Sequence, residues 1–425
     1  MLTLEDARKR DAADPLRGFR ERFYLPGGVI YLDGNSLGLA SRDAEASLMD
    51  ALESWKRQGI DGWTGGTRPW FSLGEDLGAL QAPLLGALPS EVVVTGSTTV
   101  NLHALVATFY RPSGHRTRIL TDALDFPSDL YALRSQVALR SLDPADHLIV
   151  VPSRDGRTLS EDDIIGRITE DVALALFSSV LYRSGQLLDL PRLTAAAHER
   201  GVLIGFDCSH SAGCVPHRLH EWEVDFAFWC TYKYLNSGPG ATASLFVHEH
   251  HHPPKGTTPG LAGWWGSDKQ RQFDMAALFS PAASAGAWQI GTPSVLGSAP
   301  LYGALQVLGE AGIEAVRAKS LALTDVLMDL SDAWLREHGF SVGTPREPER
   351  RGGHVALEHP AAVQLCWALK SRGIVPDFRP PNVIRFAPVA LYTSFEDVWR
   401  AMDILRAIVT RGEHLSFATE RDVIA

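Results

Sequence analysis

The chain has 425 residues, of which 45% are hydrophobic and 21% charged, the composition of a globular protein large enough for two or three domains. Its 40 basic and 50 acidic residues give a net charge of −10. This balance, together with the lack of a basic stripe, argues against nucleic acid and anionic membranes as partners.

The first ten residues are charged and contain no apolar segment, which argues against a secretory signal. No window reaches the apolar length of a membrane span. The cysteines show no C-x-x-C spacing, so we expect free thiols in a reducing cytoplasm. They are Cys208, Cys214, Cys230 and Cys366.

The chain begins with a short predicted helix, a strand at 28–33, a turn at 34–38 and a helix over 42–58. From about residue 90, apolar runs of strand length alternate with helical patterns. These runs lie at 91–95, 118–121, 147–151, 172–177, 201–206 and 226–229. Strands that are apolar on both faces and alternate with helices predict an α/β fold with a mainly parallel sheet covered by helices.

Beyond residue 295 the pattern changes. A helical stretch is followed by strands at 353–358 and 382–386 and by helices at 361–372 and 395–411. This order predicts a smaller α+β domain. We therefore expect a large domain over 31–295 and a small C-terminal domain over 296–425, to which the N-terminal segment 1–30 also belongs.

Lys233 lies among aromatic residues, between the predicted strand at 226–229 and a glycine-rich turn at 237–240. Burial lowers the pKa of a lysine, and a neutral amine can attack a carbonyl to form a Schiff base. Alternatively, the stem of Lys233 lies along apolar surface and its charge stays in water. The local residues leave both interpretations open.

Thr98 and Thr99 follow the strand at 91–95 and precede a predicted helix over 102–110. Free backbone N–H groups and a helix dipole meet at such a junction, which suits a phosphate, although a plain helix cap is the alternative. Asp207 ends another strand, where it could hold a ring nitrogen protonated or cap the next turn. With Lys233, these are the three anchors that pyridoxal phosphate needs, and all lie at strand ends of one sheet.

Two other motifs predict different chemistry. Ser36 lies in a G-x-S-x-G pattern, as in a serine hydrolase, but almost no sheet precedes it. The segment 248–252 fits the zinc motif H-E-x-x-H, which requires a helix. Pro253 and Pro254 follow at once and prevent a helix from continuing, so we expect an exposed turn there.

Several stretches together resemble the kynureninase family over nearly the whole chain. They lie at 31–38, 126–131, 210–213, 229–236, 263–266, 353–358, 377–380 and 385–386. The resemblance implies the aspartate-aminotransferase fold (PLP fold type I) and pyridoxal 5'-phosphate as cofactor. It further implies hydrolysis of L-kynurenine to anthranilate and L-alanine in tryptophan catabolism, by a cytoplasmic homodimer.

The resemblance also assigns residues to the cofactor. Lys233 would hold it covalently, Phe126 would stack on its ring and Asp207 would pair with the pyridinium nitrogen, with Asp129 and His210 close to the ring. The phosphate would be held by Thr98, Thr99, Tyr232 and Trp264, and by Thr292 from a second subunit.

For the substrate, the resemblance implies that Arg385 binds the carboxylate, a task suited to its guanidinium fork. Ser36 and Trp63 would also contact the substrate, and Trp63 is similar to that of members preferring kynurenine over 3-hydroxykynurenine. Lys233 would move the α-proton, with His210 nearby. Tyr232 either donates a proton to the product, its pKa lowered by a cationic site, or binds only phosphate.

The chain departs from the family pattern at two places. Ser267 stands where many members have histidine, and Pro293-Ser294 also differs. These changes bear on substrate preference and leave the cofactor anchors intact. Within the same fold, a cysteine desulfurase-like lyase, a selenocysteine lyase or an aminotransferase would need the same lysine and aspartate. A desulfurase would also need a mobile cysteine nucleophile, and Cys208, Cys214 and Cys230 lie too close to the predicted cofactor strands for that.

Overall fold

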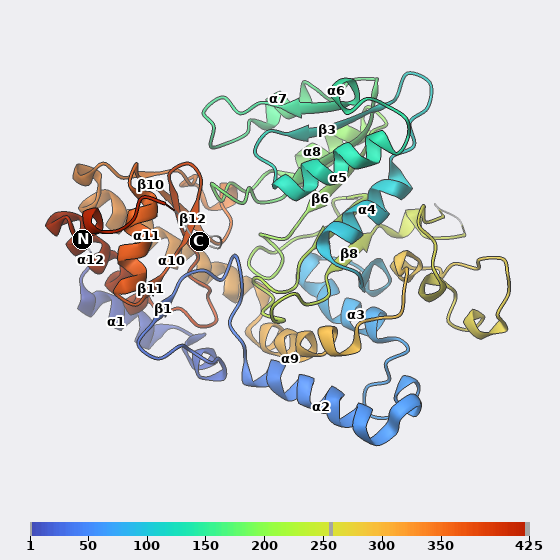
Figure 1. The fold of residues 1–425 in the computed structure, drawn as a ribbon, viewed down its shortest axis with the longest axis horizontal. Coiled ribbons are helices and arrows are strands. Elements are labelled where there is room, and N and C mark those ends of the chain that lie inside the picture. Colours follow the sequence, from blue (N-terminus) through green and yellow to red (C-terminus); the bar gives the residue numbers. More distant parts are fainter. Residues whose placement is uncertain (1, 255–257, 421–425) are drawn as a thin grey trace.

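The computed structural model describes residues 2–254 and 258–420, which form two domains side by side (Figure 1). The larger domain is built on a seven-stranded sheet and the smaller one on a four-stranded antiparallel sheet. Helix α1 (Leu4–Ala13) packs in the smaller domain against the last long helix, α12 (Phe395–Arg411). The two ends of the chain therefore meet in one domain.

The large sheet is parallel except at one strand. In spatial order its strands are β2 (Val92–Val94), β8 (Ser244–Val247), β7 (Phe226–Trp229), β6 (Leu203–Asp207), β5 (Val172–Ser178), β3 (Arg118–Asp122) and β4 (Leu148–Val151). Only β8 runs antiparallel to its neighbours, β2 and β7. The predicted mainly parallel sheet is confirmed, and β8 is the one strand of this sheet that the sequence pattern missed.

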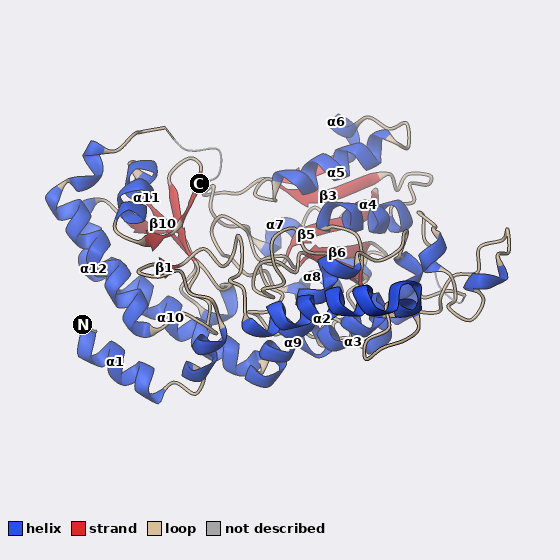
Figure 2. Ribbon diagram, turned by 60° about the horizontal axis from the view of Figure 1, so that its bottom comes forward, coloured by secondary structure: helices blue, strands red, loops and turns tan. Residues whose placement is uncertain are grey.

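Helices cover both faces of this sheet (Figure 2). On one face lie α4 (Thr98–Phe109) and α5 (Pro127–Ala138). On the other lie α3 (Leu73–Leu85), α7 (Glu161–Ile165), α8 (Leu190–His198) and α9 (Val295–Ala311), and the short α6 (Pro144–His147) leads into β4. Because both faces are covered, the central strands are almost entirely buried, which explains their continuous apolar runs.

The smaller domain places helices against an antiparallel sheet. Its strands, in order, are β12 (Asp377–Arg379), β13 (Val383–Phe386), β10 (Val355–Glu358) and β9 (Ser341–Val342). Its helices are α10 (Ile313–Trp334), α11 (Ala362–Ser371) and α12. The predicted strand at 28–33 forms only β1 (Ile30–Tyr31), which pairs in parallel with β11 (Ile374–Val375).

The boundary between the two cores lies later in the chain than residue 295. Helix α9 packs against α2 (Arg42–Gln58), and its Leu305 belongs to the core of the larger domain. The core of the smaller domain begins within α10, at Leu323. The N-terminal segment joins both domains, since Ala7 lies in the small core and Phe23 in the large one. Among the described residues, every helix is too short or too polar to cross a lipid bilayer.

Candidate functional site

A cleft of about 770 Å³ opens at the carboxyl ends of the large sheet's parallel strands, next to the smaller domain. Loops after parallel strands meet at this edge, the usual place for ligands in open α/β sheets. Ten of the residues predicted to form a site line it. They are Ser36, Thr98, Thr99, Phe126, Asp129, Asp207, His210, Tyr232, Lys233 and Arg385.

Lys233 lies in the turn after β7, with its Nζ 2.9 Å from Nε2 of His210. The segment after β1 supports this turn, because the backbone N–H of Gly38 donates to the carbonyl of Tyr232 at 2.8 Å. A Cβ at Gly38 would lie 2.3 Å from the carbonyl oxygen of Lys233, so only glycine permits this approach. The amine is thereby held at the cleft by a segment almost 200 residues away in the sequence.

His210 is buried beside this lysine. Burial, followed by the positive charges of Lys233 and Arg385, holds the pKa of His210 well below its usual value. The ring is therefore neutral at physiological pH, and its Nε2 can accept a hydrogen bond from the lysine amine. Its Nδ1 has no hydrogen-bond partner among the described residues.

Three carboxyl groups lie together at the floor of the cleft, which Asp207 and Asp129 line and next to which Asp125 is fully buried. Asp207 ends β6 and accepts a hydrogen bond from the backbone of Ser209 at 2.8 Å. Burial and the negative charges of Asp207 and Asp125 raise the pKa of Asp129 well above its usual value. Burial also raises the pKa of Asp125 to about 7. A cation such as a pyridinium N–H would relieve this repulsion, and Oδ2 of Asp129 has no partner among the described side chains.

The opposite wall of the cleft suits a phosphate. Helix α4 begins at Thr98, earlier than the predicted 102, so Thr98 and Thr99 form its first turn. Backbone N–H groups of a first turn lack partners within the helix and attract anions. The hydroxyl of Thr99 lies 2.7 Å from that of Ser128, at the start of α5, so two helix ends converge there.

Phe126 offers a flat face to the cleft. It precedes α5, is 42% exposed despite its size, and meets the ring of Tyr182 edge-on with centroids 5.3 Å apart. An exposed phenyl ring beside buried carboxyl groups suits a planar heteroaromatic ligand. The carboxyl groups, the helix ends and this ring together fit the predicted cofactor.

Arg385 reaches the cleft from β13 of the smaller domain. Burial lowers the pKa of its guanidinium group to about 10, so it stays charged at neutral pH. It is paired with Asp377, directly across from it on β12, and donates to Ser36 at 3.0 Å and to the carbonyl of Tyr182 at 2.6 Å. Its Nε has no partner among the described residues and can serve a carboxylate ligand.

Tyr232 lines the cleft, but the expectation that its pKa is lowered is wrong. Burial, reinforced by the neighbouring Cys230 and Asp207, raises the pKa of the phenol above its usual value. In this structure the phenol is therefore protonated at physiological pH. It can act as a hydrogen-bond or proton donor, and not as a phenolate.

Three predicted site residues do not reach the cleft within one chain. Trp63 packs on Trp70 and Trp265, with ring centroids 5.6 and 5.2 Å away. Trp264 is 46% exposed and meets the ring of Trp265 edge-on, and Thr292 is exposed. Their roles stay predictions, and that of Thr292 was predicted to require a second copy of the chain.

The structure argues against both competing motifs, the G-x-S-x-G pattern around Ser36 and the H-E-x-x-H pattern at 248–252. Ser36 lines the cleft, but its hydroxyl bonds to Asp377 and Arg385 and not to a histidine base, so the hydrolase arrangement is missing. The segment 248–252 forms a turn and not a long helix, as expected. However, the expectation that it is exposed is wrong at both motif histidines, since His248 and His252 are buried.

The four cysteines are free, as predicted, and all four are buried. Cys230 alone among them lines the cleft, and burial raises the pKa of its thiol. A buried, protonated thiol on the wall of the cleft is a poor nucleophile. This environment argues against a desulfurase, which needs a mobile thiolate.

Sequence reasoning missed several residues of the site. Asp377 is the main example, and its signal was its position in a hairpin that places it opposite Arg385. The others carry no local signal, because only their neighbours in space mark them. They are Asn35, Asp125, Ser128, Ser178, Tyr182, Ser209, His354 and Arg379.

Comparison with known proteins gives a consistent result. A family model described as aminotransferase class-V matches residues 79–359, and one described as kynureninase C-terminal domain matches 316–405. Among curated proteins, the kynureninase of Geobacillus thermodenitrificans is 57% identical over 100% of this chain and 98% of its own length. The kynureninase of Shouchella clausii is 55% identical over 100% of this chain and 99% of its own length.

Solved structures support the fold. A cysteine desulfurase from Thermococcus onnurineus superposes with a TM-score of 0.77 over 93% of this chain and 98% of its own, at 17% identity. A cysteine desulfurase from Escherichia coli superposes with a TM-score of 0.75 over 94% of this chain and 98% of its own, at 18% identity. At such identities the likeness concerns the fold, which is that of PLP fold type I.

Proposed function

The chain belongs to the kynureninase family, and from this premise we propose how its residues carry out the reaction. The enzyme hydrolyses L-kynurenine to anthranilate and L-alanine with pyridoxal phosphate as cofactor. The observation that carries this function is identity of 55–57% with curated kynureninases along the whole chain. Incubation of the cofactor-loaded protein with L-kynurenine should yield fluorescent anthranilate, and absence of anthranilate would contradict the function.

For the cofactor, we propose that Lys233 is its covalent anchor and that Asp207 holds its ring nitrogen protonated. Asp129, His210 and the face of Phe126 would border the ring. Thr98 and Thr99 would bind the phosphate at the end of α4. This arrangement is supported by the shared cleft and by the repulsion among buried carboxyl groups that a pyridinium cation would relieve.

When bound, the cofactor supplies an electron sink that allows the Cβ–Cγ bond of the substrate to break after water adds to the γ-carbonyl. We propose that Arg385 holds the substrate carboxylate and that Lys233 Nζ removes the α-proton. Neutral His210, 2.9 Å from that Nζ, would orient the amine by accepting a hydrogen bond from it. Ser36 would keep the guanidinium group in place through its 3.0 Å hydrogen bond.

We propose that Tyr232 donates the proton that completes the alanine product. Its raised pKa keeps this proton on the phenol. Tyr232→Phe should lower kcat about 100-fold with KM and bound cofactor unchanged, because only a proton-transfer step is lost. Tyr131→Phe, at an exposed position of α5, is the control. If added pyridoxal phosphate restores kcat of the Tyr232 variant, the residue only binds phosphate.

We also propose a homodimer in which a second chain brings Thr292, and with it Trp264 and Trp63, to the cleft. Six large hydrophobic side chains between 261 and 296 are exposed in one chain, an apolar surface typical of an interface. They are Leu261, Trp264, Phe273, Met275, Leu278 and Leu296.

Leu278→Asp should weaken dimerisation at least about tenfold, because a charge would be buried without a partner. The oligomeric state and specific activity can be measured together by light scattering and the anthranilate assay. Leu139→Asp, equally apolar and exposed but on another face, should change neither. A fully active wild-type monomer would refute the shared site.

We propose that the enzyme works in the cytoplasm. Support comes from the four cysteines, which are free thiols and buried in the structure, as suits a reducing compartment. Cell fractionation that recovers the protein with membranes or in the medium would contradict this location.

A further inference from the structure

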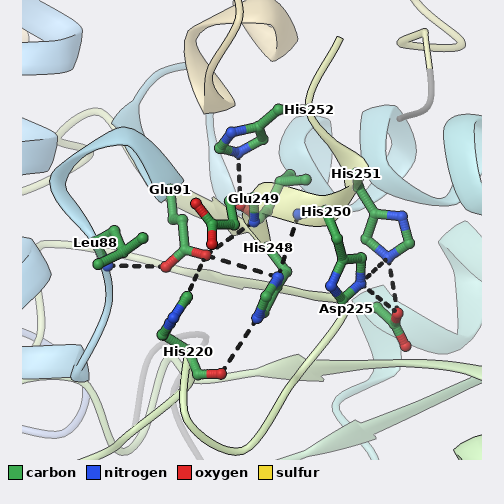
Figure 3. A network of polar contacts seen from close by, with 10 residues as sticks. Leu88, Glu91, His220, Asp225, His248, Glu249, His250, His251 and His252 are labelled. Carbon is green, nitrogen blue, oxygen red and sulfur yellow. Dashed lines mark hydrogen bonds and ion pairs between the residues drawn. The ribbon is translucent and has the colours of Figure 1, made fainter. Parts of the chain in front are cut away.

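Two clusters of histidine and carboxylate side chains lie at the edge of the large sheet opposite to the cleft (Figure 3). One consists of Glu91, His220 and His248, and the other of Asp225, His250 and His251. Asp225 directly precedes β7, and the turn Glu249–His251 follows β8 after one residue, His248; β8 runs antiparallel to β7. The two clusters therefore share one turn.

In the first cluster the polar side-chain atoms of Glu91 and His248 already have protein partners. Oε1 of Glu91 accepts from the backbone of Glu249 at 2.8 Å and pairs with Nδ1 of His220 at 2.9 Å. Nδ1 of His248 accepts from the backbone of His250 at 3.3 Å, and its Nε2 donates to the carbonyl of His220 at 3.2 Å. This cluster is a buried hydrogen-bond network that fixes the turn.

The second cluster has a different geometry. Nε2 of His251 lies 2.8 Å from Oδ1 of Asp225, and Nε2 of His250 lies 3.7 Å from the same oxygen. The two Nε2 atoms are 3.0 Å apart. Tetrahedral ligands at about 2.0–2.1 Å from a zinc ion lie about 3.3 Å from one another, so these three separations bracket the expected value.

The surroundings of this triad of Asp225, His250 and His251 also suit a zinc ion. The second oxygen of Asp225 accepts from Nε2 of His198 at 2.9 Å and from the backbone of Ile204 at 2.8 Å, which leaves Oδ1 directed at the two rings. Such outer hydrogen bonds orient carboxylate ligands in metal sites. Asp225 is almost fully buried, whereas the side chain of His250 is 44% exposed. One side of the triad therefore faces solvent, where a water could complete a tetrahedron.

We propose that Asp225, His250 and His251 bind one divalent transition-metal ion of the zinc class, with a fourth position open to water. Two imidazoles and one carboxylate are ligands that zinc takes in proteins. The four residues of β7, about 13 Å long, separate this site from the turn of Lys233. The ion therefore ties the start of β7 to the end of β8 and has no part in the reaction.

The test is a titration of untagged, cofactor-loaded enzyme with Zn²⁺ by calorimetry, after a chelator has been applied and removed. We expect one Zn²⁺ per chain and a rise in Tm with Zn²⁺ concentration, because a ligand of the folded state stabilises it. Co²⁺ at the site should show the visible absorption of tetrahedral coordination.

His250→Ala should weaken Zn²⁺ binding by about 100-fold or more, since losing even a residue that only orients a ligand costs about 10- to 100-fold. This side chain is exposed enough to be replaced without unfolding the protein. His115→Ala, an exposed histidine outside the clusters, should bind as the wild type does. Equal binding by the two variants, or no saturable binding by the wild type, would show that the triad is a hydrogen-bond network only.

Discussion

Lys233→Ala should lower kcat for L-kynurenine by at least about 10³-fold, the largest effect that we expect from a single substitution. The variant loses both the covalent anchor of the cofactor and the base that removes the α-proton, and one proton-transfer group alone contributes about 10²- to 10⁴-fold. His210 cannot replace it, because burial and nearby positive charge keep its pKa well below the usual value. Anthranilate fluorescence measures the rate.

Cofactor absorbance provides a second readout for this variant. The spectrum of bound cofactor should change to that of a free aldehyde, because no other lysine lines the cleft among the described residues. Lys56→Ala, at an exposed ion pair on α2, is the matched control and should keep the wild-type rate and spectrum. A Lys233 variant with undiminished activity would overturn the whole assignment of the cleft.

Arg385→Lys should reduce kcat/KM about 100-fold, mainly through KM. Lysine can keep the charge opposite Asp377, but it loses the planar fork that binds a carboxylate through two parallel hydrogen bonds. Removing part of a buried, hydrogen-bonded charge pair costs ~3 kcal/mol, which corresponds to this factor. Initial rates over a range of L-kynurenine concentrations separate KM from kcat.

Two controls distinguish binding from folding in this variant. Arg372→Lys changes a partly exposed arginine that pairs with Glu413 and should leave kcat/KM unchanged. The thermal unfolding of the Arg385 variant shows whether the pair with Asp377 also stabilises the domain. A variant that folds and retains a wild-type KM would exclude Arg385 as the carboxylate ligand.

Much of the fold follows from local patterns. Helix α2 occupies the predicted residues Arg42–Gln58, because Ser41 caps its first turn and Gly59, with φ of 54°, ends it. Strand β7 also has its predicted bounds. In contrast, the sequence pattern missed β8, which is as long as β7 and lies between a glycine-rich turn and a histidine run.

The sequence by itself determined that Lys233, Asp207 and the Thr98–Thr99 turn follow strands of one parallel sheet. Side chains at such positions converge whatever the details of packing, since carboxyl ends of parallel strands share an edge. Arg385 needed the family resemblance, because nothing in its own neighbourhood distinguishes it from a surface arginine.

Only the tertiary structure decided which distant groups meet. It paired Arg385 with Asp377, buried Tyr232 so that its pKa rises, and left Trp63 and Trp264 outside the cleft of one chain. It also brought Asp225 next to His250 and His251 of the 248–252 motif, although this motif does not form a helical zinc site. These outcomes depend on burial and on contacts between remote segments, and neither is encoded by the residues next to a motif.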